Sequence, residues 1–226
     1  MQLDRDENVF VLTMDDGENR FNDRWVADFN TALDTVEAAA APRALVTTGA
    51  GRFYSNGLDL EWLTTTEGLD MRRFVADAEK VLARMLSFPA ITVAALNGHT
   101  FAAGAMLALA HDFRIMREDR GFFCLPEVDI KIPFTEGMNG LVMQRLPTMT
   151  AHRVMVTGGR FAGPEGVELG IVDQAEPEDS VLPAAIKKAA ELADKDATTL
   201  GAIKQRMYAD TIHALENSTG TAPPGM

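Results

Sequence analysis

The sequence predicts an α/β fold with a mainly helical C-terminal part. Apolar runs typical of buried strands alternate with segments of helical periodicity, and glycine-bearing turns separate the two. Beyond residue 136, the patterned segments are mostly helical. The chain has 226 residues, of which 46% are hydrophobic, and this is enough for one domain with a full core.

A strand is predicted first, over residues 9–14, and the acidic turn at 15–18 ends it. Asn22 can cap the helix that follows, because its side-chain oxygen can accept a hydrogen bond from a free backbone amide in the first turn. The helix itself is indicated by apolar residues at helical spacing, namely Trp25, Phe29, Leu33 and Val36.

Glycines end the next two predicted strands. Residues 44–48 form an apolar run that stops at Gly49, and residues 91–96 form another that stops at Gly98. Between them, residues 71–86 have helical periodicity and end before a proline. Strand, turn and helix therefore alternate in the first half of the chain, as expected for an α/β core.

The second half begins with a predicted helix of small residues over 103–110 and strands over 113–116 and 122–125. The later helices are predicted over residues 136–145, 151–157, a short stretch after Gly163-Pro164, and 183–193. The last ten residues, 217–226, are rich in Gly, Pro and Thr, so we expect a flexible tail there.

Charge and composition exclude several classes of function. The net charge of −12 would repel a phosphate backbone, so we expect no nucleic-acid partner. No apolar stretch is long enough to cross a bilayer and no export signal opens the chain, so we expect a soluble, unexported protein without a membrane partner. The single cysteine, Cys124, lies in an apolar run and is predicted to be buried and inert.

Three stretches, in this order, resemble the enoyl-CoA hydratase/isomerase (crotonase) family. They are FYSNGLDL at 53–60, AALNGHTFAAGAM at 94–106 and LPEVDI at 125–130. A fourth, LGIVD at 169–173, is similar to a late element of the family, so the resemblance covers nearly the whole chain. Each motif alone is weak evidence for the family, but the occurrence of all of them in this order is strong evidence.

The resemblance implies a fold and a class of substrate. The implied fold is a spiral of strand-strand-helix units over residues 1–175, with a C-terminal helical region over 176–216 and the tail beyond it. The implied substrate is an acyl-CoA thioester, with no separate cofactor because coenzyme A is part of the substrate, and with no metal. The family commonly assembles as homotrimers or dimers of trimers, and we expect the same here.

The first two motifs imply an oxyanion hole. Carried over to this sequence, its donors are the backbone amides of Leu58 and Ala103, which would stabilise the negative charge that develops on the thioester oxygen. Gly57 would allow the first turn to be tight. Ala103 stands where the family usually has glycine, which keeps the donor but leaves less room. Small-residue turns of this kind also serve only to pack a helix on a sheet, and the residues alone leave that alternative open.

Glu127 is the candidate catalytic residue. It follows an apolar run, so its carboxylate is expected to lie in a poorly hydrated pocket, where desolvation raises the pKa. A carboxylate of this kind can accept and return a proton at carbon. The alternative is a surface glutamate at the end of a strand.

Met106 indicates which reaction is catalysed. The family's hydratases use two glutamates to hold the attacking water, and Met106 stands at the position of the first. A thioether cannot take a proton, so the resemblance favours a double-bond isomerase that shuttles one proton on Glu127. The amino-acid sequence of the motifs looks closest to that of 3,2-enoyl-CoA isomerases of the plant peroxisomal type. Another enolate reaction, such as hydration, thioester hydrolysis, decarboxylation or dehalogenation, or a non-catalytic acyl-CoA-binding role, remains open.

Residues around these motifs are assigned to the acyl pocket and to the coenzyme A site. Phe134 and Glu136 are expected to line the acyl pocket, with Glu136 either assisting as a second acid or simply starting a helix. Arg20 and Arg24 are candidates to bind the phosphates of coenzyme A, and the alternative is that they are ordinary solvated surface arginines. Ser55 and Gly57 are placed in the same coenzyme A site.

Three polar residues near the motifs are expected to be structural. Asp59 should cap or brace the first loop, and His99 and His111 have no acidic or nucleophilic partner in sequence.

The end of the sequence, Pro224-Gly225-Met226, forms no peroxisomal address, so we expect a cytoplasmic, bacterial protein.

Overall fold

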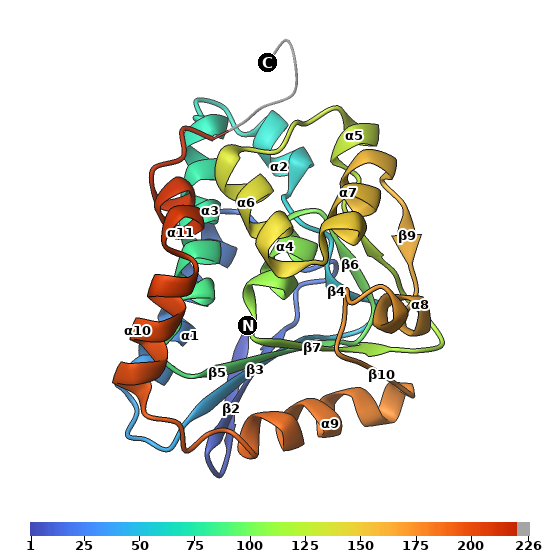
Figure 1. Ribbon diagram of the computed structural model, residues 1–226. Coiled ribbons are helices and arrows are strands. Elements are labelled where there is room, and N and C mark those ends of the chain that lie inside the picture. The colour runs from blue at the N-terminus through green and yellow to red at the C-terminus, as the bar shows by residue number, and fades with distance from the viewer. Residues whose placement is uncertain (221–226) are drawn as a thin grey trace.

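Two β-sheets and the helices around them make up the computed structural model, which describes residues 1–220 and confirms the α/β class (Figure 1). The larger sheet has the order β1-β2-β3-β5-β7-β10. Its strands are β1 (Gln2–Asp6), β2 (Val9–Met14), β3 (Ala44–Gly49), β5 (Ile91–Leu96), β7 (Phe113–Arg117) and β10 (Gln174–Glu176). All neighbours in this sheet are parallel except the pair β1 and β2.

The smaller sheet has the order β4-β6-β8-β9 and consists of very short strands. They are β4 (Phe53–Ser55), β6 (His99–Phe101), β8 (Phe123–Cys124) and β9 (Arg160–Phe161). β4, β6 and β8 each follow one strand of the larger sheet along the chain, so each turn of the spiral adds one strand to both sheets before it enters a helix. Sequence analysis did not predict β4, β6 or β9, since two or three residues carry no readable alternation and their pairing depends on distant segments.

Glycines allow consecutive turns of the spiral to lie directly on one another. A Cβ on Gly98 would lie 2.1 Å from the carbonyl oxygen of Arg52, and one on Gly121 would lie 2.7 Å from the carbonyl carbon of Gly98. No side chain fits between these backbones. The three turns are therefore stacked in register, which fixes where the following residues lie.

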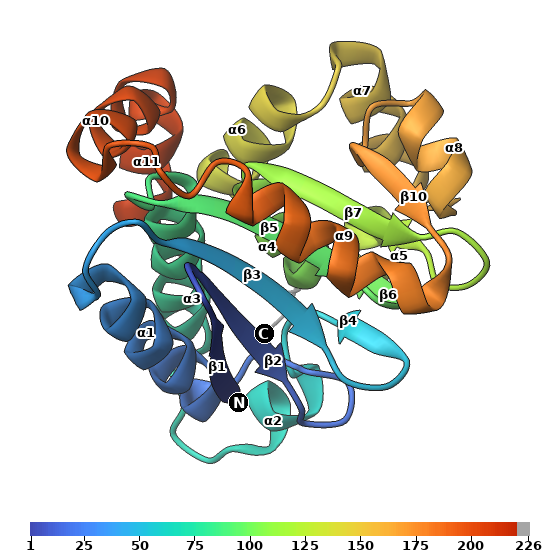
Figure 2. The ribbon, with the colours of Figure 1, turned by 90° about the horizontal axis from the view of Figure 1, so that it is seen from below.

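Helices cover both faces of the larger sheet. The helices are α1 (Asp23–Ala38), α2 (Leu60–Thr65), α3 (Met71–Leu86), α4 (Ala103–Ala110), α5 (Glu127–Ile130), α6 (Glu136–Arg145), α7 (Thr148–Thr157), α8 (Gly163–Glu168), α9 (Glu178–Ala190), α10 (Ala197–Met207) and α11 (Ala209–Glu216). α9 crosses one face of the sheet, against β3, β5 and β7, while α1, α3 and α4 lie on the other (Figure 2). Phe10 and Leu12 face the main core, and Val9 and Val11 belong to the core under α9.

The long periodic elements lie where the sequence predicts them, but two later helices have other bounds, and α7 begins at Thr148 rather than at residue 151. α1 is capped by Asn22, whose side chain accepts a hydrogen bond from the amide of Trp25 at 2.9 Å. α9 begins at Glu178 rather than at residue 183, with Pro183 inside the helix. Pro183 is exposed, so water can satisfy the carbonyl group whose helical hydrogen bond the proline removes.

The C-terminal helices are anchored to the sheet by a buried lysine. α10 and α11 lie beside α3 and α6, at the left of Figure 1. The ammonium group of Lys204 donates to the carbonyls of Phe88 (3.0 Å) and Ala90 (2.8 Å) and to the carboxylate of Asp112 (2.6 Å). A buried charge needs such partners, and here three oxygens supply them.

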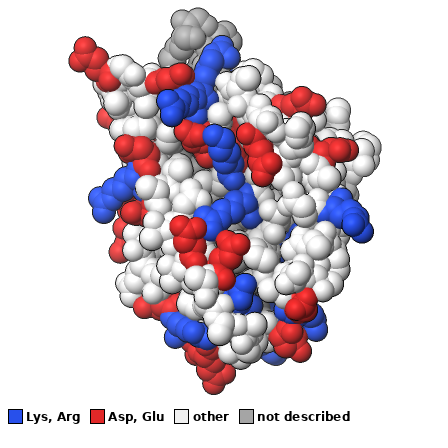
Figure 3. All heavy atoms as spheres, turned by 90° about the vertical axis from the view of Figure 1, so that its left-hand side faces the viewer, with Lys and Arg blue, Asp and Glu red and all other residues white. Residues whose placement is uncertain are grey.

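The outer face of α1, α3, α10 and α11 carries acidic and basic side chains close to one another (Figure 3). Arg84 contacts both Asp34 and Glu37, and Lys80 contacts Asp77.

No helix among residues 1–220 is long and apolar enough to cross a membrane. The prediction of a tail falls partly on residues 221–226, which lie outside the described residues.

Candidate active site

A cavity of about 270 Å³ lies where the turns after β4 and β6 meet α4, α5 and α6. Its wall includes Leu58, Ala103, Met106 and Glu127, which come from the three sequence motifs. Met138 of α6 also lines it, a residue that sequence analysis did not single out. Residues as far apart in the chain as Leu58 and Met138 therefore line one cavity.

The turns that carry the two candidate donors touch each other. Gly57 has a φ of +81°, and a Cβ at this position would lie 2.9 Å from the Cβ of Ala102 and 3.0 Å from the amide nitrogen of Ala103. Only glycine permits both this backbone conformation and this approach. The amide of Leu58 therefore lies near that of Ala103.

Both amides are free to donate. Among residues 1–220, neither the N–H of Leu58 nor that of Ala103 has a hydrogen-bond acceptor. Ala103 is the first residue of α4, where an amide has no partner within the helix and the helix dipole favours an anion. Ala102, just before it, has φ +50° and ψ −125°, a conformation that is strained for an alanine and typical of functional turns.

Asn19 holds the first of these turns in place. Its side-chain amide donates to the carbonyls of Phe53 and Tyr54, both at 3.1 Å. The hydroxyl of Ser55 donates to the carbonyl of Asn19 at 2.7 Å and accepts from the amide of Gly57 at 3.1 Å. Ser55 is fully buried in this network and does not line the cavity, so its place in the coenzyme A site stays a prediction without a contact to support it.

Glu127 has the properties of a proton carrier. It is the first residue of α5 and is 5% exposed. One of its carboxylate oxygens, Oε2, is buried and has no hydrogen-bond partner among the described residues. Burial raises the pKa of the Glu127 carboxyl to about 7. The group can therefore exchange a proton near neutral pH.

Met106 lies one turn beyond Ala103 on α4 and is 1% exposed. It lines the cavity together with Leu58, Ile132 and Met138, which leaves the wall largely apolar. Glu127 is the one carboxylate that lines the cavity in the described part of the chain. Water that entered would find a single acid and no second one to orient it.

Phe134 and Glu136 lie on a neighbouring cavity rather than on this one. That outer cavity, of about 630 Å³, shares Glu127, Ile132 and Pro133 with the first. Glu136 is exposed at the start of α6, which Thr135 caps by accepting a hydrogen bond from the amide of Met138 at 3.1 Å. The structure thus separates Glu136 from the first cavity by the chain segment before α6.

The two predicted phosphate contacts differ in position. Arg20 lines the cavity, but its guanidinium lies 2.5 Å from the carboxylate of Glu18 and 3.8 Å from that of Asp59. Arg24 does not line it, and its side chain is 81% exposed and lies 3.6 Å from Asp28. Arg20 is therefore near the substrate cavity with its charge already compensated.

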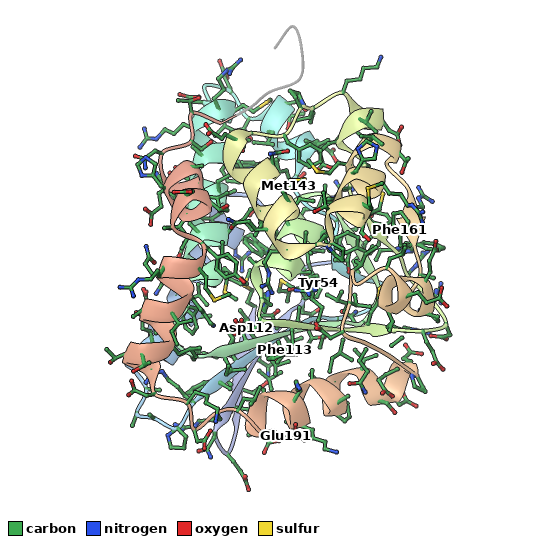
Figure 4. All side chains as sticks on the ribbon, in the orientation of Figure 1. Tyr54, Asp112, Phe113, Met143, Phe161 and Glu191 are labelled. Carbon is green, nitrogen blue, oxygen red and sulfur yellow. The ribbon has the colours of Figure 1, made fainter. Side chains whose placement is uncertain are left out.

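His111 lies in a hydrogen-bonded chain below the site. Its ring bonds the carbonyl of Leu107 and the hydroxyl of Thr47, both at 2.8 Å, and Thr47 bonds the hydroxyl of Tyr54 at 2.8 Å. Tyr54 lies in the middle of the molecule, above the sheet (Figure 4). Burial lowers the pKa of His111 to about 4, so the ring is neutral and links α4 to β4.

Asp59 and Cys124 are structural residues, the first as a helix cap and the second as a buried thiol. Asp59 caps α2 by accepting a hydrogen bond from the amide of Trp62 at 3.1 Å. Cys124 is buried, and burial raises the pKa of its thiol to about 11. Within residues 1–220, no group of three or more His, Cys, Asp or Glu side chains is placed to hold a metal ion.

Comparison with known proteins places this geometry in a family. The model of the family described as enoyl-CoA hydratase/isomerase matches residues 4–221. A curated relative, the peroxisomal enoyl-CoA delta isomerase 2 of Arabidopsis thaliana, is 36% identical over 203 residues, which is 85% of each chain.

Solved structures agree with this result. The structure of a probable enoyl-CoA hydratase from Mycobacterium tuberculosis is 26% identical, with a TM-score of 0.89 over 96% of this chain and 92% of that one. Human mitochondrial delta3-delta2-enoyl-CoA isomerase shares the fold, with a TM-score of 0.88 at 22% identity over 95% of this chain and 85% of that one. The chain therefore belongs to the enoyl-CoA hydratase/isomerase family.

Proposed function

We propose that this protein is an enoyl-CoA delta isomerase, which moves the double bond of a 3-enoyl-CoA to give the 2-enoyl-CoA. The observation that carries the proposal is the lone carboxylate of Glu127 on the cavity wall, with one buried oxygen unpartnered and the pKa near 7. A delta isomerase is also what the Arabidopsis relative is named.

The reaction needs one proton carrier and one site for negative charge. The thioester oxygen of the substrate would accept hydrogen bonds from the amides of Leu58 and Ala103. Glu127 would remove a proton from C2, and the electron pair of that C–H bond would delocalise through the double bond and the carbonyl as a dienolate. The same carboxyl group would return the proton at C4, which restores the thioester and leaves the double bond between C2 and C3.

Hydration is disfavoured by the same wall. Addition of water needs a group that orients and deprotonates it while a second group protonates carbon. Met106 occupies the wall position one turn beyond Ala103 and supplies a buried thioether there instead of a carboxylate. It would also keep water away from the dienolate.

The substrate brings its own coenzyme A, so the proposed reaction requires no other cofactor. We further propose that the protein acts as a cytoplasmic homotrimer or dimer of trimers. Large apolar side chains that remain exposed support an assembly, and they include Val128, Ile130, Met149, Val156, Ile203 and Met207.

The decisive experiment offers 3-enoyl-CoA and 2-enoyl-CoA separately to the purified protein and identifies the products by chromatography and mass spectrometry. We expect 3-enoyl-CoA to be converted to 2-enoyl-CoA and little 3-hydroxyacyl-CoA to form from either substrate. Free carboxylic acid or hydroxyacyl-CoA as the main product would assign a different reaction to the site.

A further inference from the structure

Three buried polar side chains form a hydrogen-bonded chain that takes no direct part in the proposed reaction. They are Tyr54 of β4, Thr47 of β3 and His111, which follows α4, and all three are fully buried. The chain ends on the carbonyl of Leu107, and each of its three hydrogen bonds is 2.8 Å long. Polar groups are costly to bury in an apolar core unless they are bonded, so this arrangement calls for an explanation.

The direction of every hydrogen bond in the chain is fixed. A carbonyl only accepts, so Nδ1 of His111 carries the ring proton and donates to Leu107. Burial lowers the pKa of His111 to about 4, so the ring is neutral and its Nε2 accepts from the hydroxyl of Thr47. That hydroxyl has one proton, so Tyr54 must donate to Thr47. No member can reverse its bond without leaving a neighbour unsatisfied.

This chain joins the two elements that carry the amide donors. Tyr54 is on β4, the strand that leads into the turn of the first donor. His111 directly follows α4, and the carbonyl of Leu107 that it holds belongs to the last turn of that helix. Ala103, the second donor, is at the opposite end of α4. Thr47 lies between them on β3, inside the larger sheet.

Helix α4 is thereby held at two points along its length. At its start it touches β4, where a Cβ on Gly104 would lie 2.6 Å from the carbonyl oxygen of Ser55. At its end, about 12 Å away for a helix of eight residues, the hydrogen-bonded chain returns to the same strand. A single contact would let the helix pivot, whereas two contacts fix its direction.

Arg145 also binds the end of α4, but it does not link the helix to β4. Its guanidinium donates to the carbonyls of Leu109 at 2.8 Å and of His111 at 2.6 Å. Because Arg145 belongs to α6, these bonds fix the helix end relative to α6. The connection to the turn of the first donor runs through Thr47 and Tyr54.

The start of α4 needs this support because its backbone is strained there. Ala102 has a positive φ and gives the helix no side-chain cap. A residue other than glycine keeps such a conformation only where its surroundings hold it. Rotation of the helix would relieve the strain and turn the amide of Ala103 away from the thioester oxygen.

We infer that Tyr54, Thr47 and His111 are positioning residues of the oxyanion hole, which set the distance and angle between its two amide donors. None of the three lines the cavity, so they act through the backbones of β4 and α4. The inference rests on the proposed function for the identity of the oxyanion. Displacement of a group by about 1 Å can cost about 100-fold in rate, so a buried hydroxyl can affect turnover without touching the substrate.

Removal of the hydroxyl in the middle of the chain tests the inference. Thr47→Val keeps the outline of the side chain and leaves Tyr54 without its acceptor and His111 without its donor. Thr48→Val is the matched control, because Thr48 is the next residue of β3, is also buried and donates to the carbonyl of Ala95 at 3.0 Å.

Both variants should lower the urea midpoint of unfolding, since each loses a buried hydrogen bond. Thr47→Val should in addition lower kcat by about 10–100-fold while KM stays within about twofold of the wild type. Thr48→Val should leave both constants near those of the wild type. Thr47→Ser restores the hydroxyl and should recover most of the turnover.

A spectroscopic measurement separates the oxyanion hole from catalysis. A 3-ketoacyl-CoA ionises to an enolate that carries negative charge on the thioester oxygen and absorbs in the near ultraviolet. Two well-placed amides stabilise this enolate and so lower the pKa of the bound ligand. Thr47→Val should raise that pKa by about 1–2 relative to the wild type, which matches the expected loss of turnover, and Thr48→Val should leave it unchanged.

Other outcomes would overturn the inference. An enolate pKa that is the same in Thr47→Val and the wild type would leave the chain with a role in stability alone, as would equal losses of turnover in the two valine variants. If Thr47→Val does not fold, Tyr54→Phe replaces it, because it removes only the terminal hydroxyl and should also raise the enolate pKa. An unchanged pKa in that variant would refute the inference as well.

Failure of the proposed function would be recognised separately. If the wild type does not isomerise 3-enoyl-CoA, the assignment as an isomerase is wrong. The enolate titration of the wild type and of Thr47→Val would still decide whether the buried chain positions the two amides.

Discussion

Glu127 is a buried acid whose charge the folded protein does not compensate. Its replacement by glutamine keeps the size of the side chain and removes the exchangeable proton. We expect Glu127→Gln to lower kcat by about 10²–10⁴-fold with KM within a few-fold of the wild type. Turnover of the variant close to that of the wild type would remove Glu127 from its assigned role.

The same substitution should stabilise the protein in a pH-dependent way. The pKa of the Glu127 carboxyl is about 7 when folded and near 4.5 when unfolded, so the stability linked to its proton is complete below pH 4.5 and is lost as pH rises through 7. The Glu127→Gln variant has no carboxyl group at this position and so does not lose this stability as pH rises. Chemical unfolding should therefore show Glu127→Gln to be about 1–3 kcal/mol more stable than the wild type at pH 8 and nearly equal to it at pH 5.

We expect Met106 to decide between isomerisation and hydration at this site. Met106→Glu would place a second carboxylate on the cavity wall, one turn from Ala103, and we expect slow hydration of 2-enoyl-CoA to appear. The rate should be modest, because repulsion between two carboxylates raises one pKa. Met106→Gln is the control of similar size and should not hydrate. Rapid hydration by the wild type would show that another residue, with Glu136 first to be tested, supplies the second acid.

The sequence predicted residues that line one cavity where they belong to a local motif. Leu58, Ala103 and Glu127 lie together because each stands at a fixed point of a turn or a short helix. Ser55, which the sequence placed in the coenzyme A site, does not line the cavity, because its hydroxyl is directed to the carbonyl of Asn19, 36 residues earlier.

At the scale of elements, the contact between the turns after β4 and β6 creates the pair of amide donors. Gly57→Ala would force a Cβ to within about 3 Å of Ala102 and Ala103, so the turns must separate. We expect turnover to fall by about 10²-fold or more, as for the loss of an oxyanion donor.

Gly51→Ala provides the control for this substitution. Gly51 also has a positive φ, of +72°, but a Cβ there meets nothing within 4 Å. It should therefore show a small loss of stability with turnover near that of the wild type. If the two variants lost turnover equally, backbone strain rather than turn contact would explain the effect.

Helix α3 is tied to the start of α6 and to the segment after α11 through Glu79, which is fully buried. The hydroxyls of Thr135 and Ser218 donate to its carboxylate at 2.8 and 2.9 Å. Each hydroxyl in turn accepts from a backbone amide, that of Met138 and that of Gly220. Glu79 is therefore held as an acceptor, although burial raises its pKa to about 6.

Removal of one hydrogen-bond donor to Glu79 should lower the free energy of unfolding most when the Glu79 carboxylate is ionised. Ser218→Ala should lower the free energy of unfolding by about 1–2 kcal/mol at pH 8, and by less at pH 5, where the carboxyl is protonated. Thr219→Ala, a change at an exposed neighbour, should have little effect at either pH. Equal losses at both pH values would show that Ser218 acts through packing alone.

Long elements were predictable and short strands were not, for a physical reason. The bounds of α3, α4 and α6 are those that the periodicity indicates, because each buries one stripe of apolar residues or a run of small ones. Strands of two or three residues such as β6 and β9 exist only because neighbouring turns of the spiral supply their hydrogen bonds. Their pairing is a property of the fold rather than of the local sequence.

At the scale of the whole molecule, the exposed apolar side chains on α5, α7 and α10 indicate self-association. Met149 is 76% exposed and Met207 is 60% exposed, which is costly in water for an isolated chain. Sedimentation velocity at micromolar concentration should therefore give a trimer or a dimer of trimers. A species that stays monomeric at this concentration would contradict the prediction.

The position of Lys204 late in the chain determines when its contacts with the larger sheet can form during translation. The carbonyls of Phe88 and Ala90 and the carboxylate of Asp112 lack their buried cation until a residue more than 90 positions later has left the ribosome. Strand β10 likewise joins the larger sheet only after residue 173. We therefore expect folding of the N-terminal two thirds to remain incomplete until the C-terminal helices have been synthesised.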